Sequence, residues 1–297
     1  MRVLLTGANG QFGTEYCSYT AEHAQHDDLY SLSHSDLDVT DRDQVLQVVH
    51  ALRPDVILHA GAMTNVDGCE TNQVRALMVN SFGTRNVAEA AWRSNARVVY
   101  LSSDYVFDGR GGGPDGALPY TEWDTPNPQT AYGRSKLGGE IELQTLLGPD
   151  ATIVRTSWVC GAFGHNFLKT MARLANDSSA PMPTVVDDQV GCPTFTPDLV
   201  RAVRFLAVSQ IPGLFHVSNA ESVSWCGFAQ AIFAACGHDP QRVRPISSVE
   251  YQATRTAATA PRPAFSVLDH VAMRGVGHEM RDWREALGEV APHLVSS

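Results

Sequence analysis

The chain has 297 residues, of which 43% are hydrophobic and 18% charged, as in an ordinary globular protein with one elaborate domain or two small ones. Its formal net charge of −10 argues against binding to nucleic acid or to an anionic membrane, because both attract cationic proteins. No apolar run reaches the roughly 20 residues that span a bilayer, and the N-terminus lacks the pattern of a signal peptide. We therefore expect a cytoplasmic protein without nucleic-acid or membrane partners.

The spacing of cysteines and histidines gives no sign of a metal centre. The six cysteines are scattered and form no C-x-x-C pair, a pattern that suits reduced thiols better than disulfides or structural zinc. The eleven histidines show neither H-x-x-x-H nor H-x-H spacing. We therefore predict no metal site.

Three regularly spaced glycines follow a short apolar run at the N-terminus. The run Arg2–Thr6 is a predicted strand, and a predicted helix begins among the glycines. Glycine lets the backbone pass close to a pyrophosphate, and a helix N-terminus offers free N–H groups to it. This order predicts a dinucleotide-binding turn, with a purely structural turn as the alternative. The candidate cofactor residues here are Gly7, Gly10, Gln11, Phe12 and Gly13.

The end of the second predicted strand, Asp28–Leu32, bears on the choice of cofactor. NAD-specific folds usually have an acidic residue there that holds the ribose 2′-OH, whereas this chain has Ser33 and His34. The missing acid favours NADPH, with NADH tolerated, although no arginine stands there to bind a 2′-phosphate. We expect Asp38 and Val39 to cover the adenine.

Strands and helices alternate along the chain. Asp41 is expected to cap the first helix of the series below. Helices are predicted at residues 43–52, 73–94, 163–176, 197–208, 225–236 and 281–287, with another around residues 132–136, and strands at 55–59, 97–101, 151–156 and 214–218. The alternation predicts an α/β fold with a doubly wound parallel sheet of the Rossmann type.

Small and polar residues follow two of these strands. The strand at 55–59 is followed by Ala60, Gly61, Ala62 and Thr64, where a cofactor can pass over the strand end. The strand at 97–101 leads into Ser103, Asp104 and Tyr105. Ligands of open α/β sheets bind at this edge, so these side chains are candidates for a site. The Gly- and Pro-rich loop at 110–129 is expected to fold over a substrate.

Tyr132 and Lys136 are four residues apart in a predicted helix and therefore share one face. A nearby ammonium favours the phenolate and lowers the phenol pKa from its usual value near 10, which makes the Tyr a usable acid or base. Reduction of a ketone needs a hydride at carbon and a proton at oxygen. The helix pair with Ser103 would supply the proton, and the glycine turn would position the hydride donor. The alternative is an ordinary exposed helix pair.

Taken together, these motifs resemble those of extended short-chain dehydrogenases/reductases and, more narrowly, the dTDP-4-dehydrorhamnose reductase family. The resemblance covers nearly the whole chain. It rests on Gly7-Ala-Asn-Gly10-Gln11-Phe12-Gly13, Thr64-Asn-Val66-Asp67-Gly-Cys-Glu70, Ser102-Ser103-Asp104-Tyr105-Val106-Phe107-Asp108-Gly109, Tyr132-x-x-x-Lys136, Arg155-Thr156-Ser157-Trp158-Val159, Asp188-Gln189-x-Gly191-x-Pro193-Thr194 and Arg262-Pro263-x-x-Ser266-x-Leu268-Asp269. The chain departs from the family at Ser103, where the family usually has Thr, and at Cys160, where it commonly has Tyr.

The resemblance implies an NAD(P)H-dependent reductase that converts the 4-keto group of a dTDP-linked 4-keto-6-deoxyhexose to a hydroxyl in deoxysugar biosynthesis. It implies a dinucleotide-binding domain at residues 1–156 and about 184–222, and a smaller substrate-binding domain at 157–183 and 223–297. It also allows a homodimer. The family often binds magnesium at a dimer contact, but those ligands are not matched in this chain.

The resemblance also assigns roles to single residues. Tyr132 would donate the proton, Lys136 would bind the nicotinamide ribose and tune Tyr132, and Ser103 would assist. The candidate substrate residues are Ser103, Asp104, Tyr105, Trp158, Asn166 and Arg262. Trp158 has a core aromatic as its alternative, and Asn166 a helix cap. Arg262 is either a surface charge or a partner of the nucleotide diphosphate.

Two other functions stay open. Some relatives of this family are regulatory subunits that bind the dinucleotide without catalysis, although this chain keeps Ser103, Tyr132 and Lys136. Epimerases and 4,6-dehydratases share the fold. Related dehydratases carry Asp-Glu after the hydroxyl residue, whereas this chain has Asp104 and Tyr105, so an elimination would lack one proton-transfer group.

Overall fold

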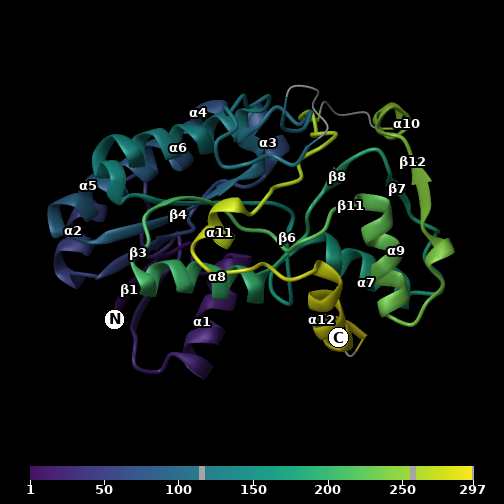
Figure 1. Cartoon of the computed structure of the whole chain (residues 1–297), viewed down its shortest axis with the longest axis horizontal. Coiled ribbons are helices and arrows are strands. Elements are labelled where there is room, and N and C mark those ends of the chain that lie inside the picture. Colours follow the sequence, from purple (N-terminus) through teal and green to yellow (C-terminus); the bar gives the residue numbers. More distant parts are fainter. Residues whose placement is uncertain (114–117, 255–258, 296–297) are drawn as a thin grey trace.

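The computed structural model describes residues 1–113, 118–254 and 259–295. At its centre lies a parallel sheet of six strands in the order β10-β5-β4-β3-β1-β2, with helices on both faces (Figure 1). The six strands are β1 (Arg2–Thr6), β2 (Asp28–Leu32), β3 (Val56–His59), β4 (Arg97–Ser103), β5 (Thr152–Thr156) and β10 (Gly213–His216). This arrangement confirms the predicted doubly wound α/β fold.

Alternate residues of each strand point to opposite faces of the sheet, and each face has its own apolar core. In β1, Val3 and Leu5 pack on one side and Leu4 on the other. The first face is covered by α1 (Gln11–His23) and α8 (Thr196–Ser209). The opposite face is covered by α2 (Arg42–Leu52), α5 (Gly83–Ser94) and α6 (Ala131–Leu147).

The predicted helix at 73–94 is interrupted by a π-helical turn. It consists of α4 (Gln73–Leu77), the π-helix Met78–Phe82 and α5. Asn80, buried inside the π-helical turn, accepts a hydrogen bond from Met63 N at 2.7 Å and donates one to Met63 O at 3.0 Å. The widened turn thus anchors the segment after β3, which helical periodicity did not predict. The short helix α3 (Val66–Thr71) before it was also not predicted.

We call the segments after β5, apart from α8 and β10, the C-terminal part. Its described residues form short strands, paired in twos, and helices. Its strands are β6 (Val159–Cys160), β7 (Thr184–Val186), β8 (Val190–Gly191), β9 (Thr194–Phe195), β11 (Val223–Ser224) and β12 (Arg244–Ile246), and the pairs are β6 with β9, β7 with β12 and β8 with β11. Its helices are α7 (Phe167–Asn176), α9 (Trp225–Ala235), α10 (Ser248–Ala253), α11 (Val271–Gly275) and α12 (Trp283–Val295). This part also has a short 3-10 turn at Pro240–Arg242, and two further 3-10 turns lie earlier in the chain, at Asp104–Val106 and Gly148–Asp150.

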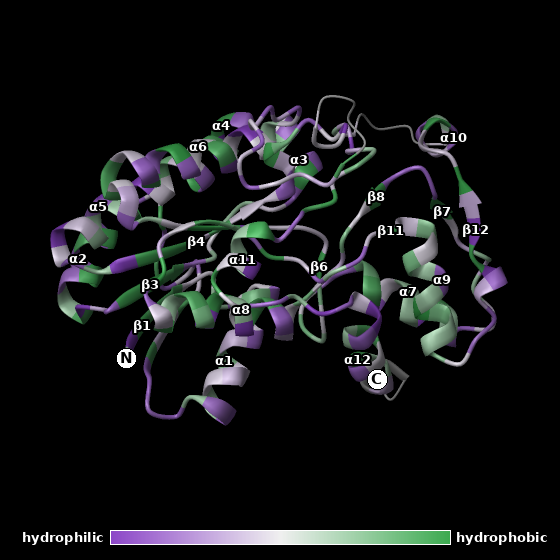
Figure 2. Cartoon of the chain, in the orientation of Figure 1, coloured by the Kyte–Doolittle hydropathy of each residue, from purple (hydrophilic) through white to green (hydrophobic). Residues whose placement is uncertain are grey.

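The helices α7, α9 and α12 enclose a separate apolar core around Leu168, Phe228 and Trp283. The apolar character of α9 is visible in Figure 2, where most of this helix is green. The helix predicted at 163–176 begins only at Phe167, because the Asn166 side chain caps it. Within the described part of the chain, no helix combines the length and the apolar character needed to cross a membrane.

Candidate functional site

The turn after β1 has the shape that its glycines predict. Gly7 has φ +74°, and a Cβ there would lie 2.8 Å from the carbonyl carbon of Ala60. A Cβ at Gly13 would lie 2.4 Å from Gly7 O, so both positions require glycine. Gly10 is the N-cap of α1, and among the described residues no side chain caps this helix. Its first N–H groups are therefore available to an anionic ligand.

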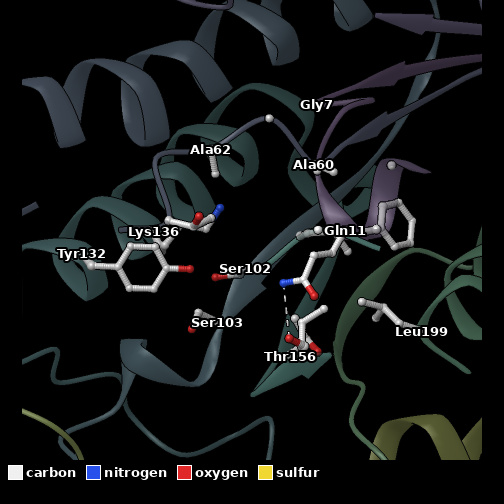
Figure 3. Close-up of a pocket in the computed structure, with 18 of the residues that line it drawn as sticks. Gly7, Gln11, Ala60, Ala62, Ser102, Ser103, Tyr132, Lys136, Thr156 and Leu199 are labelled. Carbon is white, nitrogen blue, oxygen red and sulfur yellow. Dashed lines mark hydrogen bonds between the residues drawn. The ribbon is translucent and has the colours of Figure 1, made fainter. Parts of the chain in front are cut away.

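A cavity of about 750 Å³, the first cavity, extends from this turn to β4 and α6 (Figure 3). Most of the residues predicted from the sequence line it. They are Gly7, Gly10, Gln11, Phe12, Gly13, Val39, Ala60, Gly61, Ala62, Thr64, Ser103, Asp104, Tyr105, Tyr132, Lys136 and Trp158. Sequence reasoning missed Leu37, Ser102, Thr156, Ser157, His165 and Leu199, and treated His34 only as a non-acidic position. Of these, Ser102, Thr156 and Ser157 lie at or next to strand ends, a signal that could have identified them.

Asp38 is absent from this lining. Its carboxylate accepts hydrogen bonds from Thr40 N at 2.9 Å and from Thr40 Oγ1 at 2.7 Å, so it shapes the turn locally. Asp41 accepts a bond from Gln44 N at 3.0 Å, which confirms the predicted cap of α2. The side chains that reach the cavity from this region are those of His34, Leu37 and Val39.

The N-terminal turn of α6 places Tyr132 beside the end of β4. Thr130 caps the helix by accepting a hydrogen bond from Gly133 N at 2.9 Å. A Cβ at Gly133 would lie 2.1 Å from Tyr105 O, so only glycine allows this close packing. As a result, the hydroxyls of Tyr132 and the β4 serines and the ammonium of Lys136 converge in one part of the cavity (Figure 3).

The electrostatics of this pair differ from the sequence expectation. Burial raises the pKa of Tyr132 above its ordinary value, and the hydrogen bond with Ser103 opposes this only in part. Burial also lowers the pKa of Lys136 to about 7, with the Glu140 carboxylate opposing it. The Lys136 ammonium lies 4.2 Å from the centre of the Tyr100 ring. Tyr132 therefore stays protonated at neutral pH, the state that a proton donor needs.

A buried ion pair lies below Lys136. Glu140, one helical turn further on, accepts hydrogen bonds from Arg155 Nε at 2.9 Å and from Arg155 Nη2 at 2.7 Å. Both side chains are only 3% exposed. Glu140 also accepts a bond of 2.5 Å from Ser102 Oγ. The pair thus ties α6 to β4 and β5 directly behind the cavity.

Asp104 has one carboxylate oxygen without a partner among the described residues. Ser103 Oγ donates a hydrogen bond to Asp104 Oδ1 at 2.8 Å, whereas Oδ2 is buried and accepts none. The side chain is 3% exposed, and burial raises the pKa of its carboxyl group to about 6. A buried acceptor that lines a cavity and has no partner is suited to a ligand donor.

A second cavity of about 620 Å³ shares Tyr105 and Trp158 with the first. Arg262 lines it and forms an ion pair of 3.0 Å with Asp67 of α3. Residues that were not predicted as site residues also line it, namely Phe167, Met171, Gln189, Trp225, Ser248, Tyr251 and Gln252. The two cavities therefore meet at two aromatic side chains.

Asn166 lines neither cavity. Its Oδ1 accepts the helix-capping bond from Lys169 N at 2.9 Å, so the structure shows it as a cap. Its Nδ2 donates to Gln11 Oε1 at 2.9 Å, and Gln11 Nε2 donates to Val159 O at 3.4 Å. Asn166 therefore links the glycine turn to the C-terminal part.

Among the side chains of the described residues, no three or more His, Cys, Asp or Glu are grouped so as to hold a metal ion.

Comparisons with known proteins gave consistent findings. The family model described as RmlD substrate binding domain matches residues 1–296. A dTDP-4-dehydrorhamnose reductase of Mycobacterium tuberculosis (strain ATCC 25618 / H37Rv) is 39% identical over 96% of this chain and 91% of its own. A probable dTDP-4,6-dihydroxy-2-methyloxan-3-one 4-ketoreductase of Streptomyces antibioticus is 39% identical over 100% of this chain and 97% of its own. The crystal structure of dTDP-4-dehydrorhamnose reductase from Bacillus anthracis in complex with NADP has a TM-score of 0.88 at 37% identity, covering 98% of this chain and 99% of that one.

Proposed function

We propose, because this chain belongs to the dTDP-4-dehydrorhamnose reductase family, that it reduces the 4-keto group of a dTDP-linked 4-keto-6-deoxysugar with NADPH. The product is the 4-hydroxy sugar, and the reaction belongs to deoxysugar biosynthesis. The observation that carries this proposal is the first cavity, in which one continuous space joins the glycine turn to Tyr132, Lys136 and Ser103. Because the six cysteines are free thiols, we place the reaction in the cytoplasm.

The residues of the first cavity fit a dinucleotide. At Gly7 and Gly13 the backbone leaves space that any Cβ would fill, and the uncapped start of α1 suits a pyrophosphate. His34 and Val39 would contact the adenosine end, where the absence of an acidic residue leaves room for a 2′-phosphate. Lys136 would hold the ribose at the other end. NADPH, when bound, supplies the hydride.

Tyr132 is the proposed proton donor. The carbonyl carbon of the sugar gains the hydride while its oxygen takes the proton from Tyr132 Oη, so the ketone becomes an alcohol and the phenol a phenolate. Ser103, whose hydroxyl donates to Asp104 Oδ1, would turn to donate to the same oxygen and hold it in place. Lys136 would stabilise the phenolate until solvent restores the proton.

The substrate would lie across both cavities. The sugar would contact Ser103, Asp104, Tyr105 and Trp158, and Asp104 Oδ2 would accept a hydrogen bond from a sugar hydroxyl. The nucleoside diphosphate would occupy the second cavity. There Arg262, now paired with Asp67, would exchange that carboxylate for a phosphate.

The test is to follow the absorbance of NADPH with a dTDP-4-keto-6-deoxy-L-sugar and to identify the product. We expect one NADPH oxidised for each 4-hydroxy sugar formed, with a higher kcat/KM for NADPH than for NADH. Failure to consume NADPH with any 4-keto nucleotide sugar would refute the assignment.

A control separates reduction from the other reactions of this fold. dTDP-glucose should give no keto product, because a dehydratase needs a second acid/base group where this chain has Tyr105, whose buried phenol has a raised pKa. The keto sugar without added cofactor should not epimerise. Conversion in either control would contradict the proposal.

A further inference from the structure

Trp158, at the junction of the two cavities, has an unusual backbone conformation. Its φ is +45°, in the left-handed region that residues other than glycine seldom adopt. The conformation is held by the pairing of β6 with β9 and by a hydrogen bond of 3.2 Å from Thr194 N to Trp158 O. Strained residues of this kind persist when the surrounding structure fixes them, and they cluster at functional sites.

The indole of Trp158 is held from two sides. Its ring stacks on that of Trp225 with a centroid separation of 3.6 Å and an interplanar angle of 13°. Gly191 in β8 lies against it so closely that a Cβ there would be 2.7 Å from Trp158 Cε2. The Trp225 ring on one side and the backbone at Gly191 on the other therefore fix the plane of the Trp158 ring.

Trp225 is itself held firmly. It is the first residue of α9, and its backbone N–H donates to Gln189 O at 3.3 Å. The ring of Phe167 meets its ring edge-on, at 4.6 Å and 64°. Trp225 lines the second cavity and is not among the described residues that line the first, where Tyr132 and Ser103 lie. Trp225 therefore reaches the lining of the first cavity through its stack on Trp158.

We infer that Trp225 is a positioning residue for the substrate, which sets the orientation of the Trp158 indole at the junction of the two cavities. This inference rests on the proposed function. Trp225 takes no part in hydride or proton transfer, and its contribution is to the affinity for the nucleotide sugar. Both Trp225 and Trp158 pack against the C-terminal core around α7 and α9, so this core shapes the site through the pair.

Steady-state kinetics of Trp225→Leu test the inference. Leucine keeps an apolar side chain and removes the stack. The KM for the keto sugar should rise about 10- to 100-fold, while kcat stays within about threefold and the KM for NADPH is unchanged. The matched control is Trp92→Leu, which removes an indole that is 66% exposed on α5, and it should match the wild type. An unchanged KM in Trp225→Leu would overturn the inference.

A double-mutant cycle tests whether Trp225 acts through Trp158. The effects of Trp158→Leu and Trp225→Leu on KM should be strongly non-additive, because either change removes the same stack. Additive effects would show that Trp225 acts independently and would refute its positioning role.

Circular dichroism provides a readout that needs no turnover. Two indoles stacked this closely couple their electronic transitions and give a far-ultraviolet couplet, which Trp225→Phe and Trp158→Phe should each abolish and Trp92→Phe should retain. A couplet that survives in Trp225→Phe would also overturn the inference.

NADPH oxidation, measured together with calorimetric titration with dTDP, separates the positioning role from the proposed function. A wild type that oxidises no NADPH refutes the function, whereas an active wild type matched in KM and dTDP affinity by Trp225→Leu refutes the positioning role.

Discussion

The two halves of the molecule build their parts of the site in different ways. In the N-terminal half, many site residues directly follow or end strands of the parallel sheet, as Gly7 follows β1, Ala60 follows β3 and Ser103 ends β4. In the C-terminal part, strands are only two or three residues long, and Trp158, Trp225 and Arg262 come from loops and a helix end. Backbone shape thus makes the first half of the site, and side chains from distant segments make the second.

The groups behind the cavity and those on its substrate side also differ in how completely their polar atoms are hydrogen-bonded. Behind the first cavity, His59 bonds Thr6 Oγ1 at 2.8 Å and Thr84 Oγ1 at 3.1 Å, and burial lowers its pKa to about 3, so it stays neutral. On the substrate side, Asp104 Oδ2 has no partner among the described residues, and the partly exposed pair of Arg262 and Asp67 can be exchanged. His59 thus belongs to a hydrogen-bonded support behind the cavity, whereas the substrate side keeps groups available for a ligand.

Tyr132→Phe should have the largest effect on activity, and it distinguishes proton donation from ligand binding. Loss of the proton donor should lower kcat by about 10²–10⁴-fold. Binding of NADPH and dTDP, measured by calorimetry, should stay close to that of the wild type because the ring is retained. Nearly full activity in this variant would mean that another group donates the proton.

Glu140→Gln should lower the free energy of unfolding, and it tests how much the buried pair of Glu140 and Arg155 behind the cavity stabilises the fold. Arg155 would keep a buried charge without its partner, which costs about 3–5 kcal/mol of unfolding free energy. Denaturation by urea would measure the loss. The control is Glu142→Gln, because Glu142 pairs with the 48% exposed Arg85 at 2.7 Å, and such a pair is worth at most about 1 kcal/mol. Equal losses in both variants would show that burial of the Glu140 pair is unimportant.

Asp104→Asn should have a smaller effect, visible in the pH dependence. With a pKa raised to about 6, the wild-type carboxyl group gains a proton below that pH and loses acceptor capacity. The kcat/KM for the keto sugar should therefore fall as the pH drops through 6, and the asparagine variant should lack this limb.

The same carboxyl group gives a stability prediction with a definite sign. Its folded pKa lies above its unfolded value of 3.8, so the folded state binds more protons between these two pH values. Wild-type stability should therefore fall relative to Asp104→Asn as the pH rises from about 4 to 6, and stay lower above that. Parallel stability curves for the two proteins would contradict the raised pKa.

The features that the sequence determined are those that depend on neighbouring residues. Alternating strands and helices specify the fold class, glycine spacing specifies the first turn, and the four-residue interval puts Tyr132 and Lys136 on one helix face. The Asp41 cap is also local. In each case, short-range sterics or hydrogen bonding within one turn decides the structure, so one stretch of sequence contains the information.

Only the tertiary structure decided which distant residues meet. Arg262 pairs with Asp67 across 195 positions, and Asn166 bonds Gln11 across 155. Asn166 thereby became a cap and a link, and the stacking of Trp225 on Trp158 had no signal in either local segment. The raised pKa of Tyr132 likewise follows from burial, which spacing along a helix does not reveal. The physical reason is that contacts and desolvation depend on the packing of the whole chain, whereas sequence patterns report only on neighbours.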